Sequence, residues 1–371
     1  MRIGIDAHHL NGKPQGSRTY LLSLIQELAR SAPDDRLFIY SFKPEETRRL
    51  LGVPGLTHRR LFPASARLRL PLVVPALEIL DRLSLFHSQY ICPPFSSVPE
   101  VVSIHDILFE THPDLFVGAF SRASVWLIRR SARRARRVLT GSEFSRLSIL
   151  ERYRLPEERV VAIPDAVDHL RFHPLAEDQD QNDLLRVKKL YALTTPYVLS
   201  VGRIEPRKNL VRLIRAFRRV RERLDPGLQL LLVGKKDFRF EEIDEEIRRS
   251  PEAGVRLLGT VPDEDLPALY RLASVFAFPS LVEGFGMPIL ESMACGTPVV
   301  ASRRGSLPEV GGDAVAWVEP EDEEAIATAI SEILTDTDRA ARLRKEGLLR
   351  ADRFRWEKTA RQTLAVYHQC A

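Results

Sequence analysis

Two glutamates with seven residues between them, Glu283 and Glu291, have the clearest chemical meaning in the sequence. Gly284 and Gly286 lie between them and allow close backbone approach and unusual φ/ψ values. Pro288 fits the first turn of a helix, where its missing N–H costs nothing, so a helix is predicted to begin there. Free N–H groups and the dipole at a helix N-terminus favour phosphate. The loop therefore predicts a site for a sugar diphosphate.

The segments on either side of this loop predict the elements that hold it. Residues 273–280 are typical of a short apolar strand, so the loop extends from the carboxyl end of a strand, where open α/β sheets bind ligands. Residues 294–302 predict a helix end at Gly296 and then a short buried strand. A Glu at a helix start is more often simply solvated. The succession of strand, loop, helix and strand favours the binding site.

Short apolar strands alternate with amphipathic helices along most of the chain. In the first half, strands are expected at 2–6, 36–41, 100–104 and 137–140, and helices at 18–30, 121–136 and 143–153. After a polar stretch, strands are expected at 197–201, 228–233, 275–278 and 298–300, and helices at 208–224, 263–273 and 288–295. This alternation predicts an α/β protein with two Rossmann-like halves, each a parallel sheet covered on both faces.

Length and composition are those of an ordinary globular protein. The chain has 371 residues, which is room for two domains, and 44% of its residues are hydrophobic. Residues 2–6 already form a predicted strand and the apolar runs are short, so neither a signal peptide nor a membrane span is expected. Cys92, Cys295 and Cys370 are too few for a disulfide framework or a zinc site. We expect a cytoplasmic protein with reduced thiols and no structural metal.

Residues 121–137 contain seven arginines and no acid. They predict a helix whose apolar side chains face inward while the arginines and Trp126 face outward. Such a face suits anionic lipid or a lipid diphosphate acceptor, with Arg133, Arg134 and Arg137 as candidate contacts. A solvated cationic surface is the plain alternative. Nucleic acid is not expected as a partner, because no nucleic-acid-binding motif accompanies the charge.

Five further segments carry a family resemblance together with the Glu283 to Glu291 loop: residues 103–106, 141–145, 163–168, 201–209 and 305–310. With these motifs the chain resembles the retaining family-4 glycosyltransferases over nearly its whole length, and more narrowly the bacterial mannosyltransferase-like enzymes of polysaccharide assembly. The resemblance implies the GT-B fold, with two Rossmann-like domains facing an interdomain cleft. It implies an acceptor-side domain at 1–170, completed by a C-terminal helix at 355–371, and a nucleotide-sugar domain at 171–354.

Arg203 and Lys208 follow the predicted strand 197–201, with Gly202 as the turn. Glycosyl transfer from a nucleotide sugar breaks a bond to a diphosphate, so cations must meet the negative charge that grows on the leaving oxygen. We therefore assign Arg203 and Lys208 as the clamp on the leaving group, with a surface pair at a helix start as the alternative. Arg207, beside Lys208, is expected to be solvated.

The resemblance assigns both glutamates to the donor. It implies that Glu283 faces the sugar hydroxyls and that Glu291 binds the ribose hydroxyls, both as acceptor-only carboxylates. Gly284, Phe285 and Gly286 offer backbone N–H groups to the sugar and phosphate, while the Phe285 side chain could be a packing residue only. The assigned roles leave no obvious carboxylate nucleophile. Front-face substitution is therefore favoured, with the leaving phosphate deprotonating the acceptor.

His105 follows the predicted strand 100–104 at its carboxyl end. The family has a sugar-contacting His there, so the resemblance implies this role, although a lone His is usually structural or solvated. Asp106 could orient the ring or lie near the acceptor hydroxyl. As a neighbouring carboxylate, Asp106 is expected to favour the protonated imidazole.

Two loops depart from the family's usual pattern. Gly16 lies in the first strand-to-helix connection, which can bind a phosphate, but one of the family's two glycines is replaced here and Arg18 adds charge to the diphosphate or acceptor site. An ordinary turn is the alternative. Residues 164–168 carry Asp165 and Ala166 where the family has Asn and Gly. Ala166 would be strained if that turn required a positive φ.

No cofactor and no divalent metal are expected, because no Asp-x-Asp motif accompanies the donor strand and cationic side chains can neutralise the leaving group. The leading hypothesis is a retaining hexosyltransferase that moves mannose from GDP-mannose to a glycan or polyprenyl-diphosphate-linked acceptor. The choice of GDP-mannose rests on the resemblance alone. Alternatives are a UDP-glucose- or UDP-GlcNAc-dependent transferase of the same family, a nucleotide-sugar epimerase on the same fold, and a non-catalytic sugar-nucleotide-binding partner of a polysaccharide assembly complex.

Overall fold

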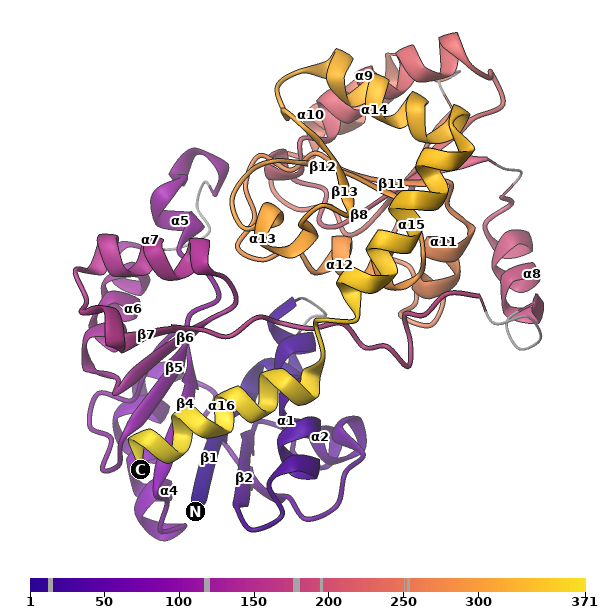
Figure 1. The fold of residues 1–371 in the computed structure, drawn as a ribbon. Coiled ribbons are helices and arrows are strands. Elements are labelled where there is room, and N and C mark those ends of the chain that lie inside the picture. Colours follow the sequence, from indigo (N-terminus) through magenta and orange to yellow (C-terminus); the bar gives the residue numbers. More distant parts are fainter. Residues whose placement is uncertain (13–15, 117–120, 176–180, 194–195, 250, 252–253) are drawn as a thin grey trace. The chain divides into compact units, whose positions relative to one another are not determined.

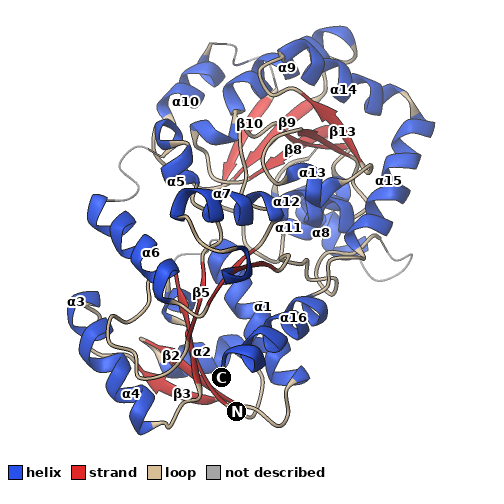
Figure 2. Cartoon of the chain, turned by 60° about the vertical axis from the view of Figure 1, so that its left-hand side comes forward, coloured by secondary structure: helices blue, strands red, loops and turns tan. Residues whose placement is uncertain are grey.

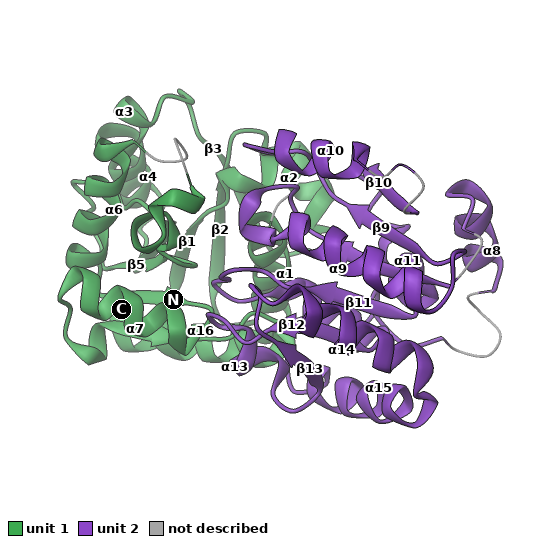
Figure 3. Ribbon diagram, turned by 90° about the horizontal axis from the view of Figure 1, so that it is seen from above, with its two compact units in different colours: residues 1–166, 355–371 green, residues 167–354 purple. Residues whose placement is uncertain are grey.

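The computed structural model describes residues 1–12, 16–116, 121–175, 181–193, 196–249, 251 and 254–371. The chain forms two compact units, and both are α/β (Figure 1). Unit 1 comprises Met1–Ala166 together with Arg355–Ala371, and unit 2 comprises Val167–Phe354 (Figure 3). The boundary expected at residue 170 lies a few residues further along the chain than this division.

Unit 1 contains a parallel sheet of seven strands in the order β3-β2-β1-β4-β5-β6-β7. The strands are β1 (Arg2–Asp6), β2 (Arg36–Ser41), β3 (Thr57–Arg60), β4 (Leu85–Gln89), β5 (Glu100–Ser103), β6 (Arg137–Thr140) and β7 (Val160–Ala162). Residues 3–6 of β1 are all buried, so both faces of the strand are covered, as expected in a parallel sheet with helices on both faces (Figure 2).

The helices of unit 1 are α1 (Gly16–Ser31), α2 (Pro44–Leu51), α3 (Ala66–Leu68), α4 (Val74–Leu80), α5 (Leu108–Thr111), α6 (Arg122–Arg134), α7 (Glu143–Tyr153) and α16 (Trp356–Cys370). The C-terminal helix α16 packs against α1. The Trp356 ring meets the Tyr20 ring edge-on, and the Tyr367 hydroxyl lies 2.6 Å from His87 Nδ1 inside the unit. The last segment of the chain is therefore part of the core of unit 1.

Unit 2 contains a parallel sheet of six strands in the order β10-β9-β8-β11-β12-β13. The strands are β8 (Tyr197–Val201), β9 (Gln229–Val233), β10 (Val255–Gly259), β11 (Val275–Phe278), β12 (Val299–Ser302) and β13 (Val315–Val318). Its helices are α8 (Gln181–Leu190), α9 (Leu210–Arg223), α10 (Glu241–Arg248), α11 (Leu266–Leu272), α12 (Met287–Ala294), α13 (Leu307–Gly311), α14 (Glu323–Thr335) and α15 (Thr337–Ala351).

Helix α9 illustrates why these segments are helical. Its buried residues Leu210, Leu213, Ile214 and Phe217 recur at the spacing of one helical face, and its arginines occupy the other face. The buried face packs against Leu230 and Leu232 of β9 within one hydrophobic cluster.

The predicted α/β architecture with two parallel sheets is confirmed. In each unit the strand order reverses between the first strand and the fourth, β1 and β4 in unit 1 and β8 and β11 in unit 2. Sheets of this order bind ligands outside the carboxyl ends of the strands at that reversal. The two candidate edges are therefore the carboxyl ends of β8 and β11, and those of β1, β4 and the neighbouring β5.

Candidate active site

Unit 2 brings one acid and two cations together at the carboxyl ends of β8 and β11. Glu283 lies on the loop after β11, and Arg207 and Lys208 lie in a short 3-10 helix after β8. Lys208 Nζ donates to Glu283 Oε1 at 2.7 Å, and Arg207 Nη1 donates to Glu283 Oε2 at 2.5 Å. Arg207 also pairs with Glu205 at 2.7 Å. One carboxylate thus holds two cations in fixed positions.

The charges of this cluster determine its ionisation. Burial raises the pKa of Glu283, but the positive charges of Arg207 and Lys208 outweigh it and hold that pKa at about 2. Burial lowers the pKa of Lys208, and the Glu283 carboxylate opposes that shift. Glu283 is therefore ionised at neutral pH, and both of its oxygens are already bonded to cations.

The prediction that Arg207 is solvated is wrong. Its side chain is only 13% exposed, because it lies between the carboxylates of Glu205 and Glu283. Arg203 has an exposed side chain and pairs with Asp237 at 3.2 Å. The two cations on Glu283 are therefore Arg207 and Lys208, whereas the assignment of Arg203 and Lys208 to the leaving group stays a prediction.

Close backbone packing positions Lys208. A Cβ atom on Gly202 would lie 3.0 Å from Lys208 Cε, so the glycine leaves room for the lysine chain. The Lys208 ammonium lies 4.4 Å from the centroid of the Phe278 ring, at the end of β11. Asn209 adopts a left-handed conformation, and its side-chain amide donates to the carbonyl oxygens of Pro279 at 3.1 Å and Pro320 at 2.6 Å. These bonds connect the end of β8 to the loops after β11 and β13.

Gly305 and Ser306 hold the Glu283 loop from the other side. Gly305 has a φ of 59°, and a Cβ atom there would lie 2.6 Å from the Glu283 carbonyl oxygen. The Ser306 hydroxyl lies 2.9 Å from the carbonyl oxygens of both Glu283 and Phe285 and can donate to either. The sequence indicated this segment through its family resemblance, but no local signal predicted that it supports the acidic loop.

The turn between the two glutamates ends at Gly286, which precedes α12. Gly286 has a φ of 107°, and a Cβ atom there would lie 2.5 Å from Leu307 Cδ2. The Phe285 side chain is buried and meets the Phe354 ring edge-on, so it is a packing residue. Gly284 is buried in the same turn. Helix α12 begins at Met287, one residue before the predicted start.

Glu291 lies in the second turn of α12. The Tyr270 hydroxyl donates to Glu291 Oε2 at 2.9 Å. Burial raises the pKa of Glu291 to about 6, and the Tyr270 bond and the charge of Arg171 oppose that shift. Glu291 can therefore gain or lose a proton close to neutral pH, unlike Glu283.

In unit 1, His105 lies at the carboxyl end of β5 between two aromatic rings. Its ring centroid is 4.8 Å from that of Tyr20 and 5.8 Å from that of Tyr90, both in edge-on contacts. Burial and the nearby His9 lower the pKa of His105 to about 4. The predicted protonated imidazole is therefore wrong, because burial dominates over any effect of Asp106. Among the described residues, His105 Nε2 has no hydrogen-bond partner.

Two acids near His105 have different environments. Asp106 accepts a hydrogen bond from the Leu108 amide at 3.1 Å and so shapes the turn that follows. Asp165 is buried, and a Cβ atom on Gly141 would lie 3.3 Å from its Oδ2. Burial raises the pKa of Asp165 to about 7. Ala166 does not have a positive φ, so the strain considered for this turn is not present.

The first loop is described only in part. Gly16 is the exposed first residue of α1, and residues 13–15 lie outside the described chain, so the predicted phosphate contact of this loop remains a prediction. Arg18 Nε donates to the Leu10 carbonyl at 3.3 Å.

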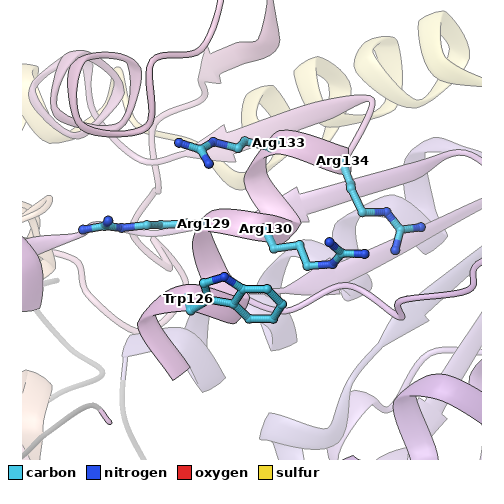
Figure 4. A pocket seen from close by; sticks show the side chains of 5 residues that line it. All are labelled: Trp126, Arg129, Arg130, Arg133 and Arg134. Carbon is cyan, nitrogen blue, oxygen red and sulfur yellow. The ribbon is translucent and has the colours of Figure 1, made fainter. Parts of the chain in front are cut away.

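Helix α6 has the predicted cationic surface, with a hollow of 290 Å³ lined by Trp126, Arg129, Arg130, Arg133 and Arg134 (Figure 4). Arg129 forms an ion pair with Glu110, whereas Arg134 donates to the Pro94 carbonyl. Arg137 is the first residue of β6 and is not among the residues that line the hollow. None of the helices in the described part of the chain is long and apolar enough to span a bilayer.

Two family models match the chain: glycosyltransferase family 4 over residues 14–171 and glycosyl transferases group 1 over residues 181–350. O-antigen chain mannosyltransferase B of Escherichia coli is 34% identical over 287 residues, 76% of this chain and 74% of that protein. Serotype-specific mannosyltransferase WbdA of Escherichia coli is 28% identical over 339 residues, 88% of this chain but only 40% of that longer protein.

Solved structures show the same fold at lower identity. Sucrose-phosphate synthase from Thermosynechococcus elongatus has a TM-score of 0.79 and 23% identity, covering 99% of this chain and 98% of that chain. HepE of Anabaena in complex with UDP and glucose has a TM-score of 0.78 and 20% identity over the full length of both chains. The fold is thus that of the two-domain GT-B glycosyltransferases. The chain belongs to glycosyltransferase family 4, and it is a hexosyltransferase.

Proposed function

We propose that this enzyme transfers mannose from GDP-mannose to a lipid-linked or surface-polysaccharide acceptor, with retention at the anomeric carbon. The observation that carries the proposal is the cluster of Lys208, Glu283 and Arg207 at the carboxyl ends of β8 and β11. The cluster places two fixed cations and one ionised carboxylate where a sheet of this strand order binds its ligand.

In this proposal, Lys208 and Arg207 stabilise the leaving diphosphate. An ammonium has three N–H donors, and Lys208 gives one to Glu283, so the others remain for phosphate oxygens. A unit charge pair at 4 Å is worth about 4 kcal/mol at an effective dielectric constant of 20. Cations that Glu283 already holds in place need no reorganisation as charge grows on the leaving oxygen. The side chains supply the positive charge, so the proposed reaction requires no metal ion.

Glu283 acts as a hydrogen-bond acceptor for the donor sugar, not as a nucleophile. Two cations hold its pKa at about 2, which makes it a weak base and a poor nucleophile. We therefore favour front-face substitution. The bond from C1 to the diphosphate oxygen breaks, the acceptor oxygen bonds to C1 from the same face, and the acceptor proton passes to a phosphate oxygen.

Glu291 binds the ribose hydroxyls in the proposed complex. Its position on α12 lies just beyond the turn that ends at Gly286, so the helix N-terminus and the carboxylate belong to one rigid element. As a carboxylate, Glu291 can accept from both ribose hydroxyls, because the Tyr270 bond occupies only one of its lone pairs.

The choice of donor and acceptor rests on relatives. O-antigen chain mannosyltransferase B and WbdA are named as mannosyltransferases. A further relative from Mycolicibacterium smegmatis, 34% identical over 54% of each chain, is named a GDP-mannose-dependent phosphatidylinositol monomannoside mannosyltransferase. We propose the same donor here and an acceptor attached to a lipid or a growing polysaccharide. With such an acceptor, we place the enzyme in the cytoplasm, with α6 against anionic lipid of the membrane.

The first test is thermal unfolding of the protein with GDP, UDP, ADP or dTDP, and then with the matching sugar nucleotides. A nucleotide at about 100 times its dissociation constant adds about 2.7 kcal/mol to the free energy of unfolding. We expect a shift with GDP and GDP-mannose, and retention of the anomeric configuration in the product by NMR. A shift with UDP alone would indicate a UDP-sugar donor in place of GDP-mannose. A product with inverted anomeric configuration would contradict the proposed mechanism.

A further inference from the structure

One helical segment of unit 1 has its polarity reversed. It runs through α3, the π-helix Arg69–Val73 and α4. Its two charged residues after Leu68, Arg69 and Glu78, are only 5% and 1% exposed. Leu72, Ile79 and Leu80 are in contrast 62%, 67% and 72% exposed. Helices that face water normally place charges outside and leucines inside.

The reversal follows from specific contacts on the inner side. Glu78 accepts from the Ser97 amide at 2.8 Å and from the Ser96 hydroxyl at 3.0 Å, so its carboxyl group has hydrogen-bond partners inside the unit. Arg69 donates to the Ala64 carbonyl at 2.8 Å, and its guanidinium lies 5.0 Å from the centroid of the Phe42 ring. These bonds hold both charges inward, and the apolar residues are left on the outer surface.

The exposed apolar residues share one side of the segment. Leu68, Leu72 and Ile79 follow one another at spacings of four and seven residues, which places them on one helical face. Val74 packs on the opposite side in a hydrophobic cluster with Phe38 of β2. The outer stripe is therefore apolar along its length and is not part of that core.

This stripe continues to the cationic hollow of α6 through one loop. The loop carries exposed Phe95, and its Ser97 is bonded to Glu78 of α4. On the loop's other side, Arg134 of α6 donates to the Pro94 carbonyl. Figures 2 and 3 both show α3, α4 and α6 along the same side of unit 1. We call this surface the α4–α6 face. It consists of Leu72, Ile79, Leu80, Phe95 and Trp126 together with Arg67, Arg82, Arg130 and Arg133.

Around the α4–α6 face, acidic side chains are buried and several basic side chains are exposed. The acids Glu78, Asp81 and Glu110 have buried side chains with internal partners, and Asp81 and Glu110 pair with Arg59 and Arg129. Several exposed cations have no carboxylate partner among the described residues: Arg67, Arg82, Arg130 and Arg133. The face therefore presents apolar side chains and unpaired positive charge together. Exposed apolar surface of this kind marks an interaction site.

We propose that the α4–α6 face docks on an anionic phospholipid surface, with Leu72, Ile79 and Leu80 inserted among the acyl chains and the arginines at the phosphates. Apolar side chains with cations around them and Trp126 beside them match a bilayer interface, where aromatic residues and cations meet the headgroups. This inference extends the lipid contact proposed for α6 and rests on the proposed function only through that contact. It adds an apolar anchor that salt does not screen.

Vesicle co-sedimentation at low and high salt separates the two contributions. The vesicles contain phosphatidylcholine alone or with phosphatidylglycerol, and the Debye length falls from about 10 Å at 0.1 M salt to about 3 Å at 1 M. We expect Arg130→Gln/Arg133→Gln to weaken binding to the anionic vesicles at low salt by roughly tenfold or more. We expect Leu72→Ser/Ile79→Ser/Leu80→Ser to bind vesicles at high salt roughly tenfold or more weakly than the unmodified protein.

The matched control is Leu349→Ser, on α15 of unit 2, where the leucine is also 62% exposed. It should bind vesicles like the unmodified protein. Each variant is checked by thermal unfolding and by turnover of soluble donor and acceptor without vesicles, so failure of the proposed transferase activity is seen separately.

Equal binding by the triple serine variant and the unmodified protein at high salt would overturn the proposal. A dimer that forms without lipid and is abolished by the serine substitutions, detected by light scattering, would assign the face to a second copy and also overturn it. Binding that disappears at high salt in every variant would leave only the arginines as lipid contacts, and the apolar anchor would be wrong.

Discussion

Glu283 in unit 2 and His105 in unit 1 both lie at the carboxyl edge of a parallel sheet, but their surroundings differ in charge. Around Glu283, Arg207 and Lys208 keep the carboxylate ionised, with a pKa of about 2. Around His105, burial lowers the imidazole pKa to about 4, and burial raises the pKa of Asp165 to about 7. The Glu283 cluster holds fixed charges, whereas burial drives His105 and Asp165 toward their neutral forms.

This difference indicates how a transferase of this fold can divide its work. A diphosphate that gains negative charge needs cations that are already oriented. A sugar hydroxyl needs acceptors and apolar ring faces, and a neutral His105 between Tyr20 and Tyr90 offers both. We therefore propose that the edge of unit 2 binds the leaving group and that the edge of unit 1 binds a neutral, hydroxyl-rich ligand.

The largest expected effect tests the charged edge. Lys208→Ala should lower kcat by roughly a hundredfold or more, because one oriented donor to the growing charge is lost. Arg203→Ala should cost less, since the Arg203 side chain is exposed and paired with Asp237. Steady-state kinetics with GDP-mannose measures both variants, and a nucleotide-induced thermal shift checks that Lys208→Ala is folded. Equal losses would restore Arg203 and Lys208 as the clamp, and an unchanged rate for Lys208→Ala would remove the clamp altogether.

Gly305→Ala should damage the same edge through the backbone. The positive φ and the 2.6 Å approach to the Glu283 carbonyl leave no place for a methyl group. We expect a cost of about 1–3 kcal/mol and weaker donor binding, because the Glu283 loop must move. Gly55→Ala is the matched control, since Gly55 also has a positive φ, of 81°, but a Cβ atom there would meet nothing within 4 Å. Thermal unfolding and GDP titration compare the two, and equal behaviour would show that Gly305 does not hold the loop.

Nucleotide affinity should depend on pH through Glu291. Its pKa is raised to about 6 by burial, so the carboxylate that accepts from ribose is lost as the pH falls below about 6. We expect the dissociation constant of GDP to rise up to tenfold per pH unit below that value. Glu291→Gln should bind more weakly at pH 8 and show a flat profile. A slope retained in Glu291→Gln would assign the titration to another group. His105 and Glu283 do not titrate there, since their pKa values are about 4 and about 2.

The smallest expected effect concerns stability at the edge of unit 1. Asp165 has a folded pKa of about 7 against an ordinary value of 3.8, so the native state holds an extra proton between these values and stability falls as pH rises through this range. Asp165→Asn removes this loss. Its gain in Tm over the unmodified protein should therefore be larger at pH 8 than at pH 5, by about 2–4 °C for each kcal/mol recovered. Thermal unfolding at both pH values measures it. Glu283 has the opposite sign, since its pKa is lowered from 4.5 to about 2 and the resulting stability is lost as the pH falls from the first value through the second.

The elements best predicted were mostly buried strands and one helix with a Ser cap at its N-terminus. Strands 2–6, 36–41, 137–140, 197–201 and 275–278 and the helix 143–153 have the expected bounds. Strands β3 and β4 were missed because their composition is polar. β3 is a strand at the edge of its sheet and reads Thr-His-Arg-Arg, while β4 contains His87, Ser88 and Gln89, all buried. The hydrogen bonds of His87 to Tyr367 and Ser103 come from segments remote in sequence, and no local pattern reveals them.

The sequence by itself determined the two alternating α/β halves and the chemistry of the loops at their strand ends, because burial periodicity and glycine-rich turns are local properties. Only the tertiary structure decided which cations share Glu283. The local sequence predicts that Arg207 is a surface residue, but its side chain pairs with Glu283, which lies on the loop after another strand. The neutral state of His105 was also decided there, because the surrounding core removes water from the ring more effectively than the adjacent Asp106 attracts a proton.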